Sequence, residues 1–551
     1  MSQILKQNKF VVTVLVITIV FGGMTFSNLP STGVSVGVQV IDGTTFNFAG
    51  YHSVDHMQLA LFNYLNTLVS ADFQPYGSWD GWNAADYFVY LQHYVLAFMH
   101  YAVSMMFDST PGYRTDYYRD FSRDLIKKMN TTEAQWNISS IEYREWSNPS
   151  HHFMDYWWPN ATSPGPDDLY VGGFRGPANI MWTGHYALMM SLYERNFHTE
   201  EMTDEISWFV ADWNNSLTTD GFGNPKEGGI WNVGLIPCEP YIVFVQCNSI
   251  PLLTTELYDS MHNTSYMESG MWDYGLDFIE TNMTDSYGLF TDGYYVMEPL
   301  GFTPASPDLV YAFPGPTLDR ITLDGQTQVS SYCNGWSLAF LEHAWEEKTV
   351  PLYSTFIDIY GREVSGNSMY VVDSYHHPST FGTYDILGSL FTLQLAKQRG
   401  DFLTRDRILN FLWSAFNQVW SEDGRMMHFD TMSLEPFLQA IMAFGWIWAH
   451  CPVSVKDLAD ARSTEFWDYP YISTADDDSI WVYQAQWDPA KSGFILNIRV
   501  DQTATLTFSN FNDTPTAYFG GMAFQDLTSS GADYTLTLSP GTYQLVIMEG
   551  S

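Results

Sequence analysis

Two cysteines and a glutamate lie close together in the middle of the chain. Cys238 and Glu239 are adjacent, and Cys247 follows them after a short apolar run. A thiol, its thiolate and a carboxylate can each accept or release a proton, so this group could carry acid–base chemistry. Asn248 and Ser249 come directly after the second cysteine. Because these residue types favour the N-cap position, the pattern predicts a helix start at this point.

The chain has 4 cysteines, which raises the question of a disulfide. A bond between Cys238 and Cys247 would close a short loop, as in many exported proteins. Cys333 and Cys451 have apolar surroundings of helical character and are predicted to be buried thiols. The spacing alone leaves both states of the first pair open, a structural disulfide or two reactive thiols.

A histidine offers a second proton-transfer group. Met181 and His185 are four residues apart at the start of a predicted helix, so they share one face. Histidine is the usual general acid or base near neutral pH, although a lone histidine is more often a hydrogen-bonded core residue. Gly184 allows a close approach of backbone or ligand. A loop rich in Tyr and Gly, which contains Tyr294, could present a hydroxyl or a ring to a substrate.

Other candidate groups are less specific. Asp72, Asp80 and Asp86, with Tyr76 among them, could act as acids, but surface acidity is the simpler interpretation in a chain with 62 Asp and Glu residues. The adjacent pairs at 151–152 and 376–377 are histidines that would not face together on a helix. Phosphate-binding glycine motifs and Cys-x-x-Cys pairs are absent from the sequence. We therefore expect no metal, no nucleotide and no other cofactor.

The elements that must position these residues are predicted to be helices. Amphipathic runs recur at 54–70, 84–107, 115–129, 178–196, 200–215, 249–262, 266–281, 334–346, 348–360, 384–399, 402–418 and 433–450. Helix pairs repeated about six times indicate a mainly α protein with an (α/α)6 barrel, although an irregular helical bundle is the alternative. Long loops at 145–178, 218–248 and 285–333 favour the barrel, because loops of that size usually carry function.

The last part of the chain changes to alternating polar and apolar residues. Strands are predicted at 479–486, 494–500, 503–509, 534–539 and 543–547. This predicts a small C-terminal β-sandwich-like domain with a structural or docking role. The predicted organisation is thus a signal peptide or anchor at 1–25, a linker at 26–53, the barrel at 54–470 and the β domain at 478–551.

Composition limits the classes of partner. The hydrophobic fraction of 46% supports a large core, and the aromatic fraction of 17% suggests an aromatic-lined cavity. The formal net charge of -39 argues against nucleic-acid binding, because a polyanion would be repelled. The same charge suits a soluble protein in a salty or extracellular medium.

The N-terminus has the pattern of an export signal. Lys6 and Lys9 precede an apolar run from Phe10 to Phe21, which is short for a membrane span. A cleaved signal and a retained anchor both fit, and such an anchor would be the chain's one contact with a membrane. We expect an exported protein, extracellular, at the cell surface or periplasmic. Sequons compatible with export occur at Asn130, Asn137, Asn160, Asn214, Asn263, Asn282 and Asn512.

Together these stretches resemble the linalool dehydratase/isomerase family, whose enzymes have an (α/α)6 barrel. The most specific piece is Cys-Glu-Pro-x-x-x-Phe-Val-Gln-Cys-Asn-Ser, here residues 238–249. The element Asn-Ile-Met-x-x-Gly-His, here residues 179–185, is the second piece, and the Gly-x-Phe…Tyr loop at 288–294 supports them. The resemblance extends over most of residues 55–450.

The resemblance implies roles for particular residues. The family's two active-site cysteines match Cys238 and Cys247, its histidine matches His185, and its neighbouring glutamate matches Glu239. Substrate-pocket positions match Met181, Phe244, Tyr294 and Tyr94. Enzymes of this family dehydrate a small tertiary or allylic terpene alcohol to an alkene and isomerise it by allylic hydroxyl transfer, without a cofactor. Such chemistry needs free cysteines, so the resemblance favours two thiols over a disulfide.

One part of the family pattern is missing. The family has an Asp and a Tyr near the N-terminus of the barrel that act on the substrate hydroxyl. In this chain Asn66 or Thr67 aligns with the acid, and Asp72 and Tyr76 are out of register. That role is therefore not transferred to any residue here.

The sequence thus predicts a hydro-lyase or isomerase of a small apolar alcohol, with Cys238, Cys247, His185 and Glu239 as the catalytic set. A carbohydrate-active enzyme is the first alternative, and it would need two cavity carboxylates such as Asp80 and Asp86. A non-catalytic surface protein that binds a hydrophobic ligand is the second. The number of assembled chains stays open, with a homo-oligomer among the options.

Overall fold

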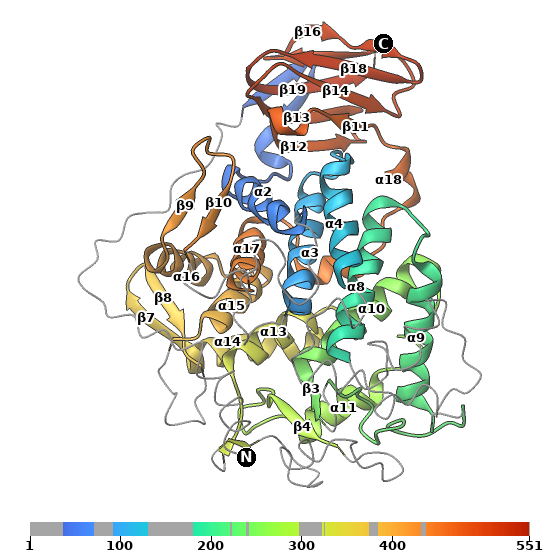
Figure 1. The fold of residues 1–551 in the computed structure, drawn as a ribbon, viewed down its shortest axis with the longest axis vertical. Helices are drawn as coiled ribbons and strands as arrows, with labels where there is room; N and C mark the ends of the chain where they lie inside the picture. Colours follow the sequence, from blue (N-terminus) through green and yellow to red (C-terminus); the bar gives the residue numbers. More distant parts are fainter. Residues whose placement is uncertain are drawn as a thin grey trace.

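In the computed structural model, residues 37–70, 92–129, 180–220, 223–238, 242–296, 322–323, 326–373, 384–430 and 437–549 are described. This part of the chain is mainly α-helical, with a group of β-strands at its C-terminal end, and Figure 1 shows the strands stacked above the helices. The predicted signal at 1–25, and with it the question of an anchor, lies outside the described residues. Within the described part, no helix has the length and apolar character needed to cross a membrane.

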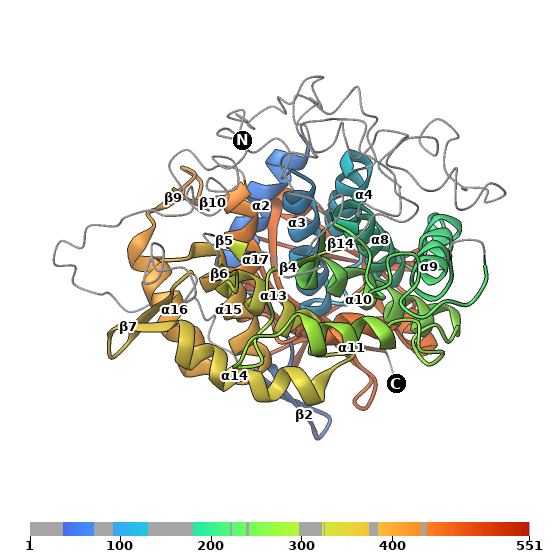
Figure 2. The same ribbon diagram turned by 90° about the horizontal axis from the view of Figure 1, so that it is seen from below.

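Six helices pack in a closed cycle. They are α3 (Gln92–Ser109), α8 (Ile180–Phe197), α10 (Val245–His262), α13 (Ser331–Phe340), α15 (Ile386–Gln398) and α17 (Phe437–His450). Each packs against the next in this order, and α17 returns to pack against α3. Figure 2 looks along these helices and shows them around a common centre. We refer to these six helices as the ring.

Other helices pack behind the ring. They are α2 (His56–Ser70) against α17, α4 (Asp116–Met129) against α3 and α8, α9 (Thr203–Thr218) against α8 and α10, α14 (Glu346–Tyr360) against α13, and α16 (Phe402–Ala415) against α15. A further helix, α11 (Asp273–Asn282), lies outside α10 and α13 in Figure 2. The arrangement confirms a mainly α fold, and the predicted helical runs match these elements closely.

Sequence pattern explains which helices are inner and which are outer. The outer helix α4 buries Tyr118, Phe121, Leu125 and Met129, which are three or four residues apart. Most of its charged residues face outward, although Lys128 is buried. The ring helix α17, in contrast, is apolar around most of its circumference, and the described part from Ala440 to Ala449 is buried throughout. A helix that is apolar on all sides needs neighbours on all sides, which the ring and the outer helices supply.

The six ring helices begin at the same end. Tyr94, His185 and Trp336 lie within the first six residues of α3, α8 and α13, and their rings are in mutual contact. We call this the site end of the ring. The opposite end, where the helices finish, is called the far end.

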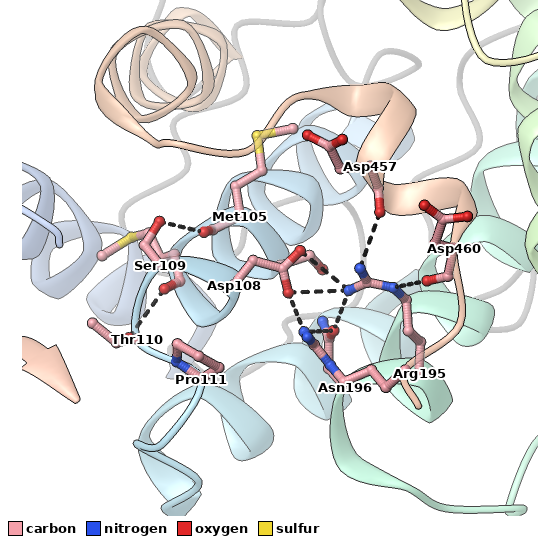
Figure 3. Close-up of polar contacts among 12 residues, drawn as sticks. Met105, Asp108, Ser109, Thr110, Pro111, Arg195, Asn196, Asp457 and Asp460 are labelled. Atoms are coloured by element: carbon pink, nitrogen blue, oxygen red, sulfur yellow. Dashed lines mark hydrogen bonds and ion pairs between the residues drawn. The ribbon is translucent and has the colours of Figure 1, made fainter. Parts of the chain in front are cut away.

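Buried ion pairs close the far end. Near the end of α3, Asp108 lies between Arg195 of α8 and Arg462, with Arg195 Nη1 3.1 Å from Asp108 Oδ1. Arg195 also donates to the carbonyl oxygens of Asp457 and Asp460, at 3.1 Å and 2.7 Å (Figure 3). Asp457 lies within the short helix η5 (Val455–Ala459) and Asp460 directly follows it, and this helix packs against α10 and α13. The chain after α17 is thereby fixed across the ends of the ring helices.

Beyond the far end lie two antiparallel sheets. The first has the strand order β11 (Tyr471–Ala475), β14 (Ala504–Ser509), β18 (Asp533–Leu538) and β17 (Thr528–Ser530). The second has the order β12 (Ile480–Asp488), β13 (Gly493–Val500), β19 (Gly541–Glu549), β15 (Pro515–Phe519) and β16 (Met522–Asp526). The predicted change to β structure is confirmed, while β11, β15, β16 and β17 are additional strands. A short helix, α18 (Thr464–Asp468), precedes β11.

The N-terminal described segment belongs with these sheets. The hairpin of β1 (Val38–Ile41) and β2 (Thr44–Asn47) packs Ile41 and Phe46 against Ile495 and Val546. The described helical part also contains four two-stranded sheets. They are β3 (Ile242–Phe244) with β4 (Gly293–Tyr295), β5 (Thr322–Leu323) with β6 (Gln326–Thr327), β7 (Gly361–Ser365) with β8 (Ser368–Val371), and β9 (Gln418–Trp420) with β10 (Met427–Phe429).

Candidate active site

The two central cysteines form a buried thiol pair. Cys238 Sγ donates to Cys247 Sγ at 3.0 Å, and all four cysteines are free thiols. The Cys238 N–H donates to the Ile242 carbonyl at 2.9 Å. Strand β3 then leads directly into α10, which brings Cys247 back beside Cys238. In the structure the two cysteines are therefore a pair of thiols, and their part in proton transfer stays a prediction.

The predicted helix start at Asn248 is wrong by three residues. Helix α10 begins at Val245 with Phe244 as its N-cap, so Cys247 is the third helical residue. The Asn248 side chain does not cap the helix. It accepts a hydrogen bond from the Ile236 N–H at 2.9 Å and donates one to the Ile236 carbonyl at 3.0 Å. The amide of Asn248 therefore ties the two ends of the cysteine loop together.

His185 is a buried neutral imidazole. Its Nδ1 is 2.7 Å from the Tyr101 hydroxyl, and the whole residue is inaccessible to solvent. Burial lowers the pKa of His185 to about 3, because the charged form has no water to solvate it. The imidazole therefore stays uncharged across the physiological pH range and can accept a proton only from a strong acid.

Tyr94 connects the histidine with the thiols. Its hydroxyl is 3.9 Å from Cys247 Sγ, and its ring meets the His185 ring edge-on with centroids 5.2 Å apart. The three groups come from α3, α8 and α10, which are consecutive members of the ring. One proton donor or acceptor from each helix thus faces the same centre.

Aromatic side chains surround this centre. Phe98 lies 5.8 Å from His185, 5.2 Å from Trp336, 5.5 Å from Phe391 and 5.4 Å from Phe444, measured between ring centroids. These rings come from α3, α8, α13, α15 and α17. Such a lining is apolar and excludes water from the polar groups it encloses.

A close contact between α8 and α10 sets the distance from His185 to the cysteines. Gly184 faces Pro251 of α10, and a Cβ at Gly184 would lie 3.0 Å from Pro251 Cδ. A larger residue at 184 would therefore push the two helices apart. The predicted close approach at this glycine is a helix–helix contact.

The remaining predicted pocket residues lie on α8, β3 and β4. Met181 is buried one turn before His185 on α8, and Phe244 ends β3 immediately before α10. Tyr294 in β4 pairs with Val243 and packs edge-on against Phe278 at 5.0 Å. Its contact with a substrate stays a prediction.

Several predicted acids cannot be assessed. Glu239 lies outside the described residues, as do Asp72, Tyr76, Asp80 and Asp86. Asn66 and Thr67, which align with the family's acid position, are exposed on the outer helix α2. Among the described residues no group of three or more His, Cys, Asp or Glu is arranged to hold a metal ion. The predicted absence of a cofactor remains a prediction.

Sequence reasoning did not single out Tyr332 at the start of α13, while the prediction that the next residue, Cys333, is a buried thiol is confirmed. Burial raises the pKa of Tyr332, and the neighbouring acidic groups Asp292, Cys333 and Cys247 raise it further. Cys333 follows it and donates its Sγ hydrogen to Gln246 Oε1 at 3.0 Å. The available signal was the tyrosine four residues before Trp336 on a predicted apolar helix, which alone does not indicate a site.

Comparison with known families bears on this part of the chain. Residues 230–430 match the family model described as Linalool dehydratase/isomerase. The matched segment includes both cysteines of the thiol pair and the start of α13, while Tyr94 and His185 precede it. It is narrower than the resemblance drawn from the motifs, which extended over residues 55–450. Over residues 230–430 the resemblance to the linalool dehydratase/isomerase family is confirmed.

Proposed function

We propose that this protein is a cofactor-independent dehydratase/isomerase of a small apolar alcohol of the tertiary or allylic class. The observation that carries the proposal is the meeting of the Cys238–Cys247 thiol pair, Tyr94 and His185 at one aromatic-lined centre. The family match over residues 230–430 supports the same class of reaction. A carbohydrate-active enzyme has no comparable support among the described residues, because its candidate acids Asp80 and Asp86 lie outside them.

We also propose that the ring is the inner layer of an (α/α)6 barrel. The proposal is supported by the closed cycle of six neighbouring helices and by the helices that pack behind them. In such a barrel the substrate would enter at the site end, since the far end is occupied by ion pairs and sheets. The catalytic groups would then lie on the first turns of the ring helices.

Dehydration requires a proton for the leaving oxygen. The C–O bond breaks, the hydroxyl leaves as water with one added proton, and a neighbouring carbon loses one proton to give the alkene. Cys247 accepts a hydrogen bond from Cys238, so its own hydrogen is available for the substrate oxygen. Glu239, next in sequence to Cys238, would return the proton to the pair or tune the Cys238 thiol.

His185 suits the removal of a proton from carbon. A carbon next to a developing allylic cation is strongly acidic, so a weak base with a pKa of about 3 is sufficient. The surrounding aromatic faces of Phe98 and Trp336 would stabilise the positive charge while it exists. Met181, Phe244, Tyr294 and Tyr94 would shape the pocket around the hydrocarbon.

Isomerisation uses the same groups in reverse order. The protonated His185 returns its proton to a carbon of the alkene, and the released water adds to the other end of the allylic cation so formed. The proton that this water then loses returns to the thiol pair. A dry, aromatic-lined centre favours this step, because few other water molecules compete with the one just formed. The substrate and product therefore have the same composition in isomerisation and differ by one water in dehydration.

The test is detection of alkene in the headspace above the enzyme and a set of allylic and tertiary alcohols. Cys247→Ala should lower turnover by at least about 100-fold, since a positioned acid–base group contributes that much. Cys451→Ala is the matched control, because it removes an equally buried thiol at the far end. Unchanged turnover in Cys247→Ala would overturn the proposal.

A further inference from the structure

The proposed mechanism uses two of the four thiols and gives no role to Cys333. Cys333 is the third residue of α13 and is fully buried. It lies at the site end, directly after Tyr332, whereas Cys451 lies just beyond the end of α17 at the far end. A buried thiol beside the site invites a specific explanation.

The thiol of Cys333 holds the residue before the catalytic cysteine. Its Sγ donates to Gln246 Oε1 at 3.0 Å, and Gln246 is itself buried in the first turn of α10. Burial and the neighbouring Asp292 raise the pKa of Cys333, so the thiol stays protonated and remains a hydrogen-bond donor. The bond therefore joins the first turns of α10 and α13.

The first turn of α13 is itself firmly held. Asp292 Oδ1 accepts from both the N–H and the hydroxyl of Ser330, at 2.7 Å and 2.8 Å. The Ser331 hydroxyl donates to Asp385 Oδ2 at 2.6 Å. These two carboxyls come from the chain before β4 and from the residue before α15. The start of α13 is thus fixed from two sides and can serve as a support.

The hydrogen bond from Cys333 acts on the residue next to Cys247. Gln246 directly precedes Cys247 on α10, so the bond restrains the chain immediately before the catalytic thiol. A hydrogen bond in such a buried setting also specifies geometry, because leaving Gln246 Oε1 unpaired would be costly. A displacement of about 1 Å at a catalytic group can lower the rate by up to about 100-fold.

We propose that Cys333 is a positioning residue whose hydrogen bond to Gln246 holds Cys247 against Tyr94. The inference rests on the proposed function for its catalytic readout, and it involves no covalent step. It predicts that Cys333 can be replaced by another donor of similar size but not by an apolar residue. Serine supplies such a donor, and alanine does not.

The catalytic test compares Cys333→Ala, Cys333→Ser and Cys451→Ala. We expect Cys333→Ala to lower kcat by about 10-fold or more with KM changed much less, because the reacting groups are misplaced while the pocket remains. Cys333→Ser should restore most of kcat. Cys451 contacts Ser109 and Gln58 at 3.3 Å and 3.4 Å, so Cys451→Ala is a comparable loss of a buried thiol that should leave kcat unchanged.

A second measurement needs no substrate. Methyl methanethiosulfonate modifies accessible thiols, and the rate at Cys247 can be followed by mass spectrometry of its peptide. Cys333→Ala should change this rate several-fold, and Cys333→Ser should return it to the wild-type value. If the wild type makes no alkene, the proposed function fails while this rate still decides the role of Cys333.

Two results would overturn the inference. The first is a Cys333→Ala protein with wild-type kcat and a wild-type modification rate at Cys247. The second is a Cys451→Ala protein with the same losses, which would show a general effect of removing a buried thiol. Should Cys333→Ala fail to fold, Gln246→Met removes the acceptor at similar volume and must reproduce the loss of kcat.

Discussion

Two buried aspartates at opposite ends of the ring have opposite acid–base behaviour. Asp108 at the far end is buried, yet Arg195 and Arg462 outweigh the effect of burial and hold its pKa below the ordinary value. Asp292 at the site end is equally buried, and burial raises its pKa to about 6 despite hydrogen bonds from Ser330. The same side chain is thus a permanent anion where the ring is closed and a weak acid where chemistry is proposed.

The difference extends to the neighbours of each aspartate. At the far end, Glu342 also meets Arg399 at 2.8 Å and Lys456 at 3.3 Å, so buried charge is paired. At the site end, burial keeps His185 neutral and raises the pKa of Tyr332 and Cys333. Paired charges fix the position of helices, whereas uncharged polar groups can exchange protons with a substrate.

The largest expected effect is at the far end. Asp108→Asn removes the carboxylate between Arg195 and Arg462 and leaves two buried guanidinium groups without their anion. We expect the free energy of unfolding to fall by about 3–5 kcal/mol. Guanidinium unfolding at neutral pH measures it. An equal loss of unfolding free energy in Asp292→Asn under the same conditions would contradict the proposed difference between the two ends.

The next effect is a pH dependence at the site end. The folded-state pKa of Asp292, about 6, lies above its ordinary value of 3.8, so the fold favours the protonated carboxyl. Its stabilising contribution is complete below about pH 4 and is lost as the pH rises through 6.

Asp292→Asn keeps an oxygen that accepts from Ser330 and removes this dependence. The variant should match the wild type near pH 3.5 and exceed its unfolding free energy by about 1–3 kcal/mol at pH 7. Chemical denaturation at the two pH values measures the difference. A variant less stable than the wild type at pH 7 would show that Asp292 has a charged partner.

A smaller effect tests the spacing of α8 and α10. In Gly184→Ala the new Cβ would lie 3.0 Å from Pro251 Cδ, which opposes the gain of about 1 kcal/mol in helix propensity. We expect little change in stability and a fall in kcat of about 10-fold, because His185 moves relative to Cys247. Gly366→Ala, where a Cβ meets nothing within 4 Å, is the control. Equal kcat in both variants would contradict this view.

The smallest effect concerns an ion pair at the surface. Lys348 Nζ lies 2.9 Å from Glu280 Oε1, and the glutamate side chain is 53% exposed. Lys348→Ala should change the unfolding free energy by no more than about 0.5 kcal/mol, because water and salt screen the pair. A loss similar to that of Asp108→Asn would mean that burial is not what separates the two cases.

Local pattern was sufficient to predict most of the helices and the change to strands after residue 470. The predicted runs at 54–70, 115–129 and 384–399 nearly coincide with α2, α4 and α15, because their apolar spacing is regular. The start of α10 was misplaced because Asn248 is a residue type preferred at N-caps, whereas its side chain forms hydrogen bonds with the backbone of Ile236. A residue's preference cannot reveal a partner that tertiary structure supplies.

Contacts between residues far apart in the sequence also limited what could be predicted. Cys333 lies 87 residues after Gln246 in the sequence, and no motif joins them, so only the fold reveals their hydrogen bond. The packing of Phe46 against Ile495 and Val546 could not be predicted from the sequence either, although the strands that carry Ile495 and Val546 were predicted. The motif around Cys238 and Cys247 was visible because both residues lie in one short segment.

The closed cycle of the ring also has a consequence for biogenesis. Helix α3 packs between α8 and α17, and more than three hundred residues separate its end from the start of α17. At a synthesis rate of about 5–20 residues per second, α3 waits roughly 15–65 s for its last neighbour. During that time the apolar face that α17 will cover is exposed. The ring can close only after nearly the whole chain has been made, so a folding helper that shields α3 should raise the yield of active protein.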